Sequence, residues 1–448
     1  EMFEVPEWAA NKVVYQIFPS RFAATEPVDK ELWYKAPITP MDDLHGNLRG
    51  IIEHMDDIQN LGIDVLYMTP IFQSNSCHKY DTTDYYQIDP SFGTTEDLKE
   101  LVQKAHERGM KVVLDAVYNH TGREFFAFAD ILENGEKSKY RDWYFIDGFP
   151  LKSEWGEIPN FKCFGYYGGM PKLNLKNPEV EKYITDVACY WIKECDIDGW
   201  RLDVGDEISH FFWKNFRKAV KAVKKDMLII GEIWHYAGDF LEGDEWDTVM
   251  NYPFYLNLID LLADEKITVS QFVQNLGYLK GRLNKNCYPL MWNLIDSHDT
   301  ARFLHLCNDN KKKQHLAAAF QLLLPGMPMI YYGDEYAMPG ANDPDCRRGM
   351  YWDEEYQDKE MYEWYKRLIQ VRKSHACIVE GELAGIVTED EEGTIVLIRK
   401  NGEETIAMIF NCSSSAKKFN EYTQKYNLLT ENTFDGNVEG FDAAVIVL

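Results

Sequence analysis

The 448-residue chain is poor in positive charge, and this excludes partners that need a basic surface. It has 47 lysine and arginine residues against 73 aspartate and glutamate residues, for a formal net charge of −26. Nucleic acids and anionic membranes both attract clustered basic side chains, because their phosphates are negative. We therefore expect neither a nucleic acid nor a membrane as a partner.

The sequence also lacks paired cysteines and long apolar runs. Nine cysteines, an odd number, are spread from Cys77 to Cys412 without a C-x-x-C pair, which excludes a complete disulfide framework and a spaced zinc site. The longest apolar run, 316–332, is broken by one glutamine and two prolines and predicts a buried helix, turn and strand rather than a membrane span. No signal peptide is recognisable, although a start at Glu1 fits the loss of a leader or an upstream domain. We expect a cytoplasmic protein with reduced thiols.

Short apolar segments alternate with amphipathic helical patterns along most of the chain. Continuous apolar strands are typical of a parallel sheet that is covered on both faces, and eight of them alternating with helices predict an α/β (β/α)8 TIM barrel. A doubly wound open sheet is the alternative, but no G-x-G-x-x-G motif follows the first segment. The eight predicted strands lie in residues 13–19, 65–70, 111–120, 199–204, 227–233, 249–254, 290–296 and 327–333.

Two regions interrupt this alternation. The residues between His120 and Asn177 are rich in glycine, aromatic and charged residues, and a connection of that length is usually functional or a small subdomain. After about residue 373 the helical patterns stop, and an alternating segment with Asn401-Gly402 at its centre predicts a β-hairpin. The predicted division is a barrel in 1–119 and 178–372, an inserted subdomain in 120–177 and a C-terminal antiparallel β-sandwich in 373–448.

Three predicted strands end in acidic residues, namely Asp203, Glu232 and Asp299. The active residues of a barrel of this type lie at the carboxyl ends of its strands. Side chains alternate along a strand, so Arg201 and Asp203 share one face, which we expect to point to the barrel axis. Asp206 and Glu207 lie beyond the strand and are expected to start a helix or line a loop.

Three carboxylates at one barrel mouth favour glycoside hydrolysis. This reaction needs a proton on the leaving oxygen and a carboxylate near the developing oxocarbenium carbon. A partly buried glutamic acid suits the first role, and an aspartate that stays ionised beside Arg201 suits the second. The alternative is that the three acids are unrelated capping residues at strand ends.

The order and wording of these segments resemble the α-amylase family, glycoside hydrolase family 13. The resemblance extends over essentially the whole chain and implies the same layout of barrel, inserted subdomain and C-terminal β domain. The matching segments are DAVYNH (115–120), MPKLNLKNP (170–178), GWRLDV (199–204), GEIW (231–234) and IDSHD (295–299).

The resemblance implies a role for each matching residue. Asp203 would be the nucleophile, Glu232 the general acid/base and Asp299 the stabiliser of the transition state. Arg201 would hold the nucleophile ionised. His120 and His298 would bond to sugar hydroxyls, and Tyr80 would stack beneath the sugar, although Lys79 stands where the family commonly has glycine.

Two longer segments are similar to the cyclomaltodextrinases, neopullulanases and maltogenic amylases. They are residues 231–253, in which Trp234 would contact the leaving-group side, and residues 340–352, in which Asp343 and Arg347 would bind sugars on the other side. The resemblance implies cleavage of α-1,4 bonds in maltodextrins, cyclodextrins and pullulan, with an α-glucan oligosaccharide as the partner. The oligomeric state stays open, because the N-terminal β domain typical of the subgroup is not seen here.

No cofactor is expected to be required. Asn119 matches a Ca²⁺ ligand of many α-amylases, so a Ca²⁺ ion is left open, but the carboxylate and carbonyl ligands it would need are not identifiable in the sequence. Two further alternatives remain: an α-glucosidase or glucanotransferase of the same family, and a non-catalytic carbohydrate-binding relative. The presence of all three acids argues against the second.

Overall fold

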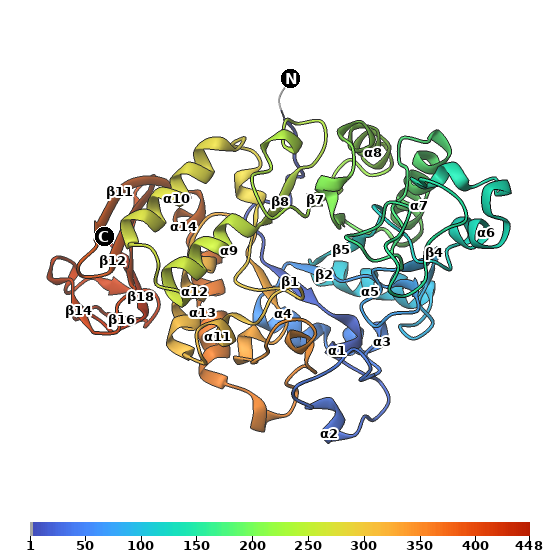
Figure 1. Cartoon of the computed structure of the whole chain (residues 1–448). Helices are drawn as coiled ribbons and strands as arrows, with labels where there is room; N and C mark the ends of the chain where they lie inside the picture. The colour runs from blue at the N-terminus through green and yellow to red at the C-terminus, as the bar shows by residue number, and fades with distance from the viewer. Residues whose placement is uncertain (1–2) are drawn as a thin grey trace.

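Eight parallel strands form the sheet at the centre of the molecule, in a computed structural model that describes residues 3–448 (Figure 1). Their order is β10-β1-β2-β5-β6-β7-β8-β9. The two outer strands approach each other, since the Met327 N–H donates to the Met291 carbonyl oxygen at 2.7 Å and the Asn293 N–H to the Met327 carbonyl oxygen at 3.2 Å. The prediction of a (β/α)8 barrel is therefore confirmed. The strands are β1 (Val14–Ile17), β2 (Val65–Met68), β5 (Lys111–Ala116), β6 (Gly199–Leu202), β7 (Leu228–Gly231), β8 (Thr248–Asn251), β9 (Trp292–Asn293) and β10 (Met329–Tyr331).

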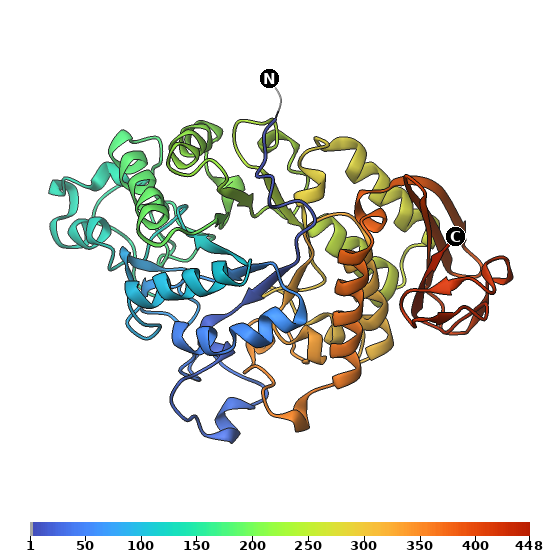
Figure 2. The same ribbon diagram turned by 180° about the vertical axis from the view of Figure 1, so that it is seen from behind.

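Helices cover the outside of this sheet, and Figure 2 shows them from behind. Capping residues fix where several of them begin: Thr94 and Asp97 form a capping box at the start of α5, and Asn177 caps α7. One connection departs from the strict alternation, because β7 and β8 are joined by a loop that contains only the 3-10 turn Gly238–Phe240. The main helices are α3 (Leu48–Glu53), α4 (Met55–Leu61), α5 (Thr95–Glu107), α7 (Pro178–Cys195), α8 (His210–Val223), α9 (Tyr252–Leu258), α10 (Val269–Arg282), α12 (Lys311–Leu323) and α13 (Lys359–Ser374).

Two further units extend the barrel. Between β5 and α7 the chain forms α6 (Phe126–Asn134) and irregular segments held by isolated β-bridges, such as the one from Cys163 to Pro171. A hairpin of β3 (Phe72–Ser74) and β4 (Thr82–Ile88) follows β2. The C-terminal unit lies to one side of the barrel (Figures 1 and 2). It consists of an antiparallel sheet in the order β11-β12-β13-β18-β15-β16 and a two-stranded sheet, β14 (Lys417–Lys418) with β17 (Asn437–Val438).

The predicted hairpin at the Asn-Gly pair forms the centre of this C-terminal sheet. Asn401 pairs with Glu404, and Gly402 has a φ of +61°, a conformation that side chains with a Cβ rarely adopt. The strands of the six-stranded sheet are β11 (Glu382–Glu389), β12 (Thr394–Asn401), β13 (Glu404–Asn411), β15 (Tyr426–Asn427), β16 (Asn432–Thr433) and β18 (Asp442–Val447).

Alternation along the strands divides the core into two layers. Trp200 and Leu202 of β6 belong to the apolar cluster between the sheet and the helices. Val14, Tyr67 and Trp292 belong to a separate cluster on the opposite faces of their strands, which fills the barrel interior. The interior is thus packed, and the chemistry has to take place at one end of it. In the described residues no helix has the length and apolar character that crossing a bilayer requires.

Candidate active site

A cavity of about 500 Å³ lies at the carboxyl ends of the barrel strands. Eight of the ten predicted site residues line it, and the other two, Arg201 and His298, lie directly beneath it with 0% and 1% of their surfaces exposed. The sequence therefore predicts correctly which residues come together. The lining residues are His78, Tyr80, His120, Phe164, Met170, Asp203, Val204, Asp206, Glu207, Glu232, Trp234, Asp299, Asp343 and Arg347.

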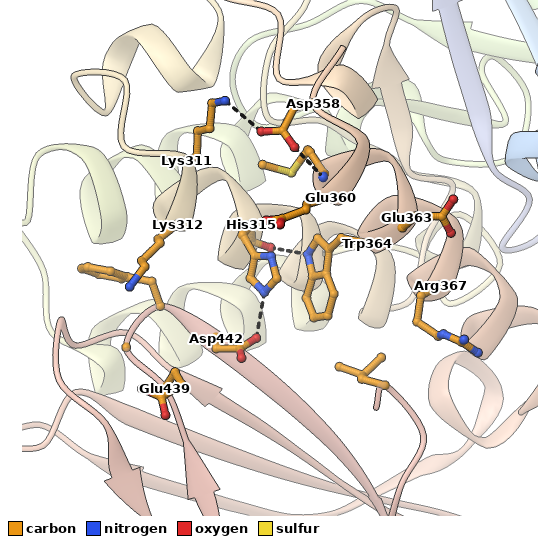
Figure 3. A pocket seen from close by; sticks show the side chains of 14 residues that line it. Lys311, Lys312, His315, Asp358, Glu360, Glu363, Trp364, Arg367, Glu439 and Asp442 are labelled. Carbon is orange, nitrogen blue, oxygen red and sulfur yellow. Dashed lines mark hydrogen bonds and ion pairs between the residues drawn. The ribbon is translucent and has the colours of Figure 1, made fainter. Parts of the chain in front are cut away.

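A slightly larger cleft of about 560 Å³ lies elsewhere, between α12, α13 and the C-terminal sheet (Figure 3). His315 stacks on Trp364 with ring centroids 3.7 Å apart and contacts Asp442 across the joint at 2.7 Å. Lys311 is paired with Asp358 at 2.8 Å. Because these charged groups bind one another, the cleft is a joint between the barrel and the C-terminal unit, and we assign the chemistry to the first cavity.

Arg201 holds three carboxylates at the bottom of the catalytic cavity. Its Nη1 donates to both oxygens of Asp115, at 3.0 and 3.1 Å, and to Oδ1 of Asp203 at 3.0 Å. Its Nη2 forms an ion pair with Oε2 of Glu232 at 2.9 Å, without hydrogen-bond alignment. The expected axial direction of Arg201 and Asp203 is confirmed, and Asp115 is the third member of the cluster.

The backbone just after Asp203 is strained and bonds to the second acid. Val204 has φ +48° and ψ +37°, a left-handed conformation that is unfavourable for a β-branched residue. This turn directs the Val204 N–H to Oε1 of Glu232 at 2.8 Å. The indole Nε1 of Trp234 lies 3.5 Å from the other oxygen of Glu232, and its ring stacks on Tyr252 at 3.7 Å. Glu232 is thus oriented by donors on both sides.

Burial and neighbouring charge set the proton affinity of these acids. Asp203 and Glu232 are each 7% exposed. Burial, followed by the charge of Glu232, raises the pKa of Asp203 well above its ordinary value, and Arg201 opposes this rise. Burial also raises the pKa of Asp115, again against the effect of Arg201. Asp115 and Asp203 therefore bind a proton more strongly than isolated aspartates do.

Asp299 lies at the mouth of the cavity, where its side chain is 33% exposed. It contacts Nε2 of His298 at 3.3 Å and the guanidinium of Arg347 at 3.6 Å. Arg347 also pairs with Asp343 at 3.0 Å, and its Nε donates to the His298 carbonyl oxygen at 2.9 Å. Asp343 and Arg347 therefore form a charged wall beside Asp299, on loops that follow β9 and β10.

Tyr80 and His120 connect the loop before β4 to the barrel. The Tyr80 hydroxyl donates to Oδ2 of Asp115 at 2.8 Å, and its ring lies parallel to that of His298 with centroids 5.5 Å apart. His120 donates from Nε2 to the Tyr80 carbonyl oxygen at 2.9 Å and accepts from Asn119 at Nδ1. Burial lowers the pKa of His120 to about 4, so the ring is neutral near pH 7. Both of its nitrogens bind the protein in this structure.

Asn119, the residue at which a Ca²⁺ ion was left open, already bonds to a cationic side chain. Its Oδ1 accepts from the ammonium group of Lys172 at 2.6 Å, and the same ammonium donates to the Glu207 carbonyl oxygen at 2.7 Å. In residues 3–448 no three histidine, cysteine, aspartate or glutamate side chains are grouped closely enough to bind a metal. The residues at Asn119 therefore do not fit Ca²⁺, because a lysine occupies the oxygen that the ion would need.

Several residues that line the cavity were not predicted from the sequence. They lie on loops that are far apart along the chain and meet only in the folded protein. Phe164, which is 39% exposed with its ring 5.5 Å from that of His120, and Met170 belong to the glycine-rich segment 163–171. Asp206 and Glu207, predicted to start a helix or line a loop, form a 3-10 turn that faces the cavity. His78 also lines the cavity. It lies two residues before the predicted site residue Tyr80, and this proximity could have indicated it.

The structure also shows how Lys79 is accommodated at a position where the family commonly has glycine. Lys79 has a φ of +68°, the left-handed region that favours glycine. Its Nζ forms an ion pair with the buried Asp89 at 3.1 Å and donates to the Ser74 carbonyl oxygen. This anchoring holds the loop in the conformation that glycine would adopt without strain.

Comparison with known proteins agrees with this geometry. Residues 16–381 match the family model for the alpha amylase catalytic domain. The chain is 46% identical to a cyclomaltodextrinase of Geobacillus thermopakistaniensis, over 93% of this chain and 71% of that protein. It is 43% identical to neopullulanase 2 of Thermoactinomyces vulgaris, over 92% of this chain and 71% of that protein. The solved structure of a cyclomaltodextrinase superposes with a TM-score of 0.94 at 39% identity over 99% of this chain and 79% of the other. A hydrolase of cyclic α-maltosyl-(1→6)-maltose from Arthrobacter globiformis superposes with a TM-score of 0.90 at 35% identity, over 99% of this chain and all of the other. The protein belongs to the α-amylase family of glycoside hydrolases.

Proposed function

We propose that the protein is a retaining hydrolase of α-1,4-glucosidic bonds in cyclodextrins and maltodextrins, with pullulan as a further substrate. The observation that carries this proposal is the meeting of Asp203, Glu232 and Asp299, from the ends of three strands, in one cavity above Arg201. Relatives named cyclomaltodextrinase, neopullulanase and maltogenic alpha-amylase support this substrate class.

The reaction proceeds in two displacements. An oxygen of Asp203 bonds to the anomeric carbon while the glycosidic C–O bond breaks, and Glu232 gives its proton to the leaving oxygen. Glu232, now ionised, takes a proton from water as the water oxygen displaces Asp203, which restores both carboxyl groups. Asp203 and Glu232 contact the two terminal nitrogens of one guanidinium, which holds both acids on the same side of the cavity floor and supports a nucleophile and an acid acting on one bond.

The proton that this mechanism needs is shared within the buried pair. In the substrate-free structure both oxygens of Glu232 face N–H donors, whereas Arg201 contacts a single oxygen of Asp203. The proton therefore fits best on Asp203 before substrate binds, in keeping with its raised pKa. A glycosidic oxygen beside Glu232 is an acceptor and favours the proton on Glu232, which leaves Asp203 ionised for attack.

The remaining residues bind and orient the sugar. Arg201 positions the nucleophile, and Asp299 stabilises the positive charge that develops on the sugar ring. Tyr80 stacks beneath the ring in the cleavage subsite, and Trp234, 41% exposed, contacts the leaving-group side. Asp343 and Arg347 line the cavity and bond to sugar hydroxyls. His120 also lines it and bonds to a hydroxyl where a sugar oxygen replaces the Tyr80 carbonyl, and His298 acts from directly beneath the cavity.

A second candidate is hydrolysis of a cyclic tetrasaccharide that contains α-1,6 bonds. The support for it is that the Arthrobacter globiformis enzyme superposes on this chain with a TM-score of 0.90 at 35% identity. The identity to the cyclomaltodextrinase is higher, so α-1,4 cleavage remains the main proposal. An α-glucosidase or glucanotransferase of the same family would differ only in its products.

Product analysis on β-cyclodextrin, maltotriose, pullulan and the cyclic tetrasaccharide tests these proposals. We expect ring opening of β-cyclodextrin and release of short maltodextrins, with the α-anomer formed first in proton NMR. Initial release of the β-anomer would reject retention. Rapid cleavage of the cyclic tetrasaccharide alone would favour the second candidate, and no cleavage of any of the four would reject a hydrolase.

We also propose that the enzyme works inside the cell without a cofactor. All nine cysteines are free in the structure. An intracellular maltogenic amylase of Bacillus subtilis is 42% identical over 92% of this chain. The reaction itself needs only the two carboxyl groups and water.

A further inference from the structure

Gln16 lies inside the barrel, beneath the active site, in direct contact with His298. It belongs to β1, on the same face as Val14 of the interior cluster, and 0% of its surface is exposed. Its amide Nε2 lies 2.7 Å from Nδ1 of His298, a residue from the loop after β9, 282 positions away in the sequence. A buried amide at this distance forms a hydrogen bond, and its direction decides which tautomer the imidazole adopts.

The partners on the far side of the ring decide that direction. Nε2 of His298 lies 2.8 Å from the Tyr80 hydroxyl and 3.3 Å from Oδ2 of Asp299. The Tyr80 hydrogen is donated to Asp115, so the Tyr80 oxygen is left to accept. An Nε2–H can donate to the Tyr80 oxygen and lies beside the Asp299 carboxylate without hydrogen-bond alignment, whereas a bare Nε2 would place its lone pair near that carboxylate. Gln16 therefore donates to Nδ1.

Cationic neighbours keep the ring neutral, so a choice of tautomer exists. Burial, followed by the charges of Arg347 and Arg201, lowers the pKa of His298 well below its ordinary value. A neutral imidazole has one N–H, and an amide that donates to Nδ1 places it on Nε2. The titratable and charged groups that face His298 are Asp299, Tyr80, Arg347, Arg201, Glu232 and His78.

We propose that Gln16 is a positioning residue that fixes His298 as the Nε2–H tautomer and so keeps an N–H donor on the Tyr80 oxygen, beside Asp299 and the bound sugar. This inference rests on the proposed function for its effect on the reaction, but the tautomer itself does not depend on that function. The oxygen Oε1 of Gln16 has no hydrogen-bond partner among the described residues. With Nε2 directed to His298, the Oε1 atom stays buried without a partner, which costs free energy.

Gln16→Glu separates this role from simple packing. A carboxylate can only accept, so the neutral ring would carry its proton on Nδ1 and lose the Nε2–H donor. We expect kcat/KM to fall on the order of 10-fold to 100-fold, by analogy with the loss of a residue that orients a metal-bound histidine. The carboxylate also favours the imidazolium, the one form of the variant that still donates from Nε2. The activity of this variant should therefore decline at a lower pH than that of the wild type.

Gln321→Glu is a matched control. Gln321 is also 0% exposed and donates to two backbone carbonyl oxygens, of Asn293 and Met329, without touching a histidine. The control should lower the melting temperature and leave the pH profile of kcat/KM in place. If both variants reduce activity with the same unshifted profile, Gln16 acts through packing alone and the inference is wrong.

Nitrogen-15 NMR of histidine-labelled protein tests the tautomer directly. The His298 signals are those among eleven histidines that disappear in His298→Asn. We expect a protonated Nε2 and a bare Nδ1 in the wild type, and the reverse in neutral Gln16→Glu. This measurement on the wild type stands even where the variants fold poorly. A protonated Nδ1 in the wild type would overturn the inference while hydrolysis continued, whereas absent hydrolysis with a protonated Nε2 would overturn the proposed function alone.

Discussion

Replacement of Arg201 by methionine would test the charge balance of the active site. The variant removes the guanidinium that contacts Asp115, Asp203 and Glu232 and leaves three buried carboxyl groups to face one another. Burial already raises the pKa of Asp115 and Asp203 in the wild type, and Arg201 opposes both rises. Without it, the carboxyl groups should bind protons still more strongly in the folded state.

The expected loss of stability depends on pH. Removing one partner of a buried ion pair costs about 3–5 kcal/mol. With an unfolding entropy of about 2.1 cal/mol/K per residue, this lowers the melting temperature by roughly 3–5 °C for a chain of this size. A carboxyl group whose pKa is raised in the folded state makes its full contribution to the free energy of unfolding at a pH below its unfolded pKa of about 3.9. This contribution is lost as the pH rises through the pKa of the group in the folded state. Arg201→Met should therefore be destabilised most near neutral pH and least in mild acid.

Differential scanning calorimetry across this pH range measures the effect, with Arg372→Met as control. Arg372 is equally buried but donates to backbone carbonyl oxygens, among them those of Leu322, Leu324 and Asn11. Burial lowers the pKa of Arg372 to about 9, so the residue is charged from mild acid to neutral pH and its replacement should change the melting temperature by a similar amount throughout that range. If the two variants show the same pH dependence relative to the wild type, the buried carboxyl cluster does not govern stability, and our account of Arg201 fails.

Three further predictions concern the catalytic acids, the cavity wall and calcium. Asp203→Asn and Glu232→Gln should each lower kcat on β-cyclodextrin by about 10⁴-fold or more, because each removes a group that forms or breaks a bond; a rate near that of the wild type in a reducing-sugar assay would reject the assignment. Phe164→Ala should raise KM several-fold with little change in kcat, since its ring lines the cavity beside His120 and carries no group that reacts; a loss confined to kcat in steady-state kinetics would contradict this. Excess EDTA should change neither melting temperature nor activity, because the Lys172 ammonium holds the oxygen of Asn119; a loss that Ca²⁺ restores would show that the lysine does not replace the ion.

The fold and the centre of the site follow from local patterns in the sequence. Every predicted strand segment overlaps a strand of the barrel, because parallel strands covered on both faces are short apolar runs. Alternation along β6 correctly directs Arg201 to the axis and Trp200 to the helices. The acids could be predicted for the same reason, since the ends of parallel strands converge at one rim.

The residues that the sequence did not reveal depend on contacts between distant loops. No helix forms between β7 and β8, and a short 3-10 turn brings Glu207 to the cavity. Neither feature can be recognised from a periodic pattern of apolar residues. Phe164 reaches the cavity because its segment folds back from the inserted unit, and Lys172 reaches Asn119 in the same way. Local propensity contains no information on such approaches, which are determined by tertiary packing.

The charge distribution of the site also explains why it suits a cationic transition state. Asp115, Asp203 and Glu232 surround the single guanidinium of Arg201, and the further carboxylate of Asp299 stands at the mouth. With one proton on the pair of Asp203 and Glu232, negative charge still exceeds positive charge when Asp299 is counted. Surplus negative charge in a site with little water is unfavourable until a positive charge forms beside it, and glycoside cleavage forms that charge on the sugar ring. Repulsion among these carboxylates destabilises the folded protein, and the positive charge of the transition state reduces that repulsion. The carboxylates therefore bind the transition state more strongly than the substrate, which lowers the barrier.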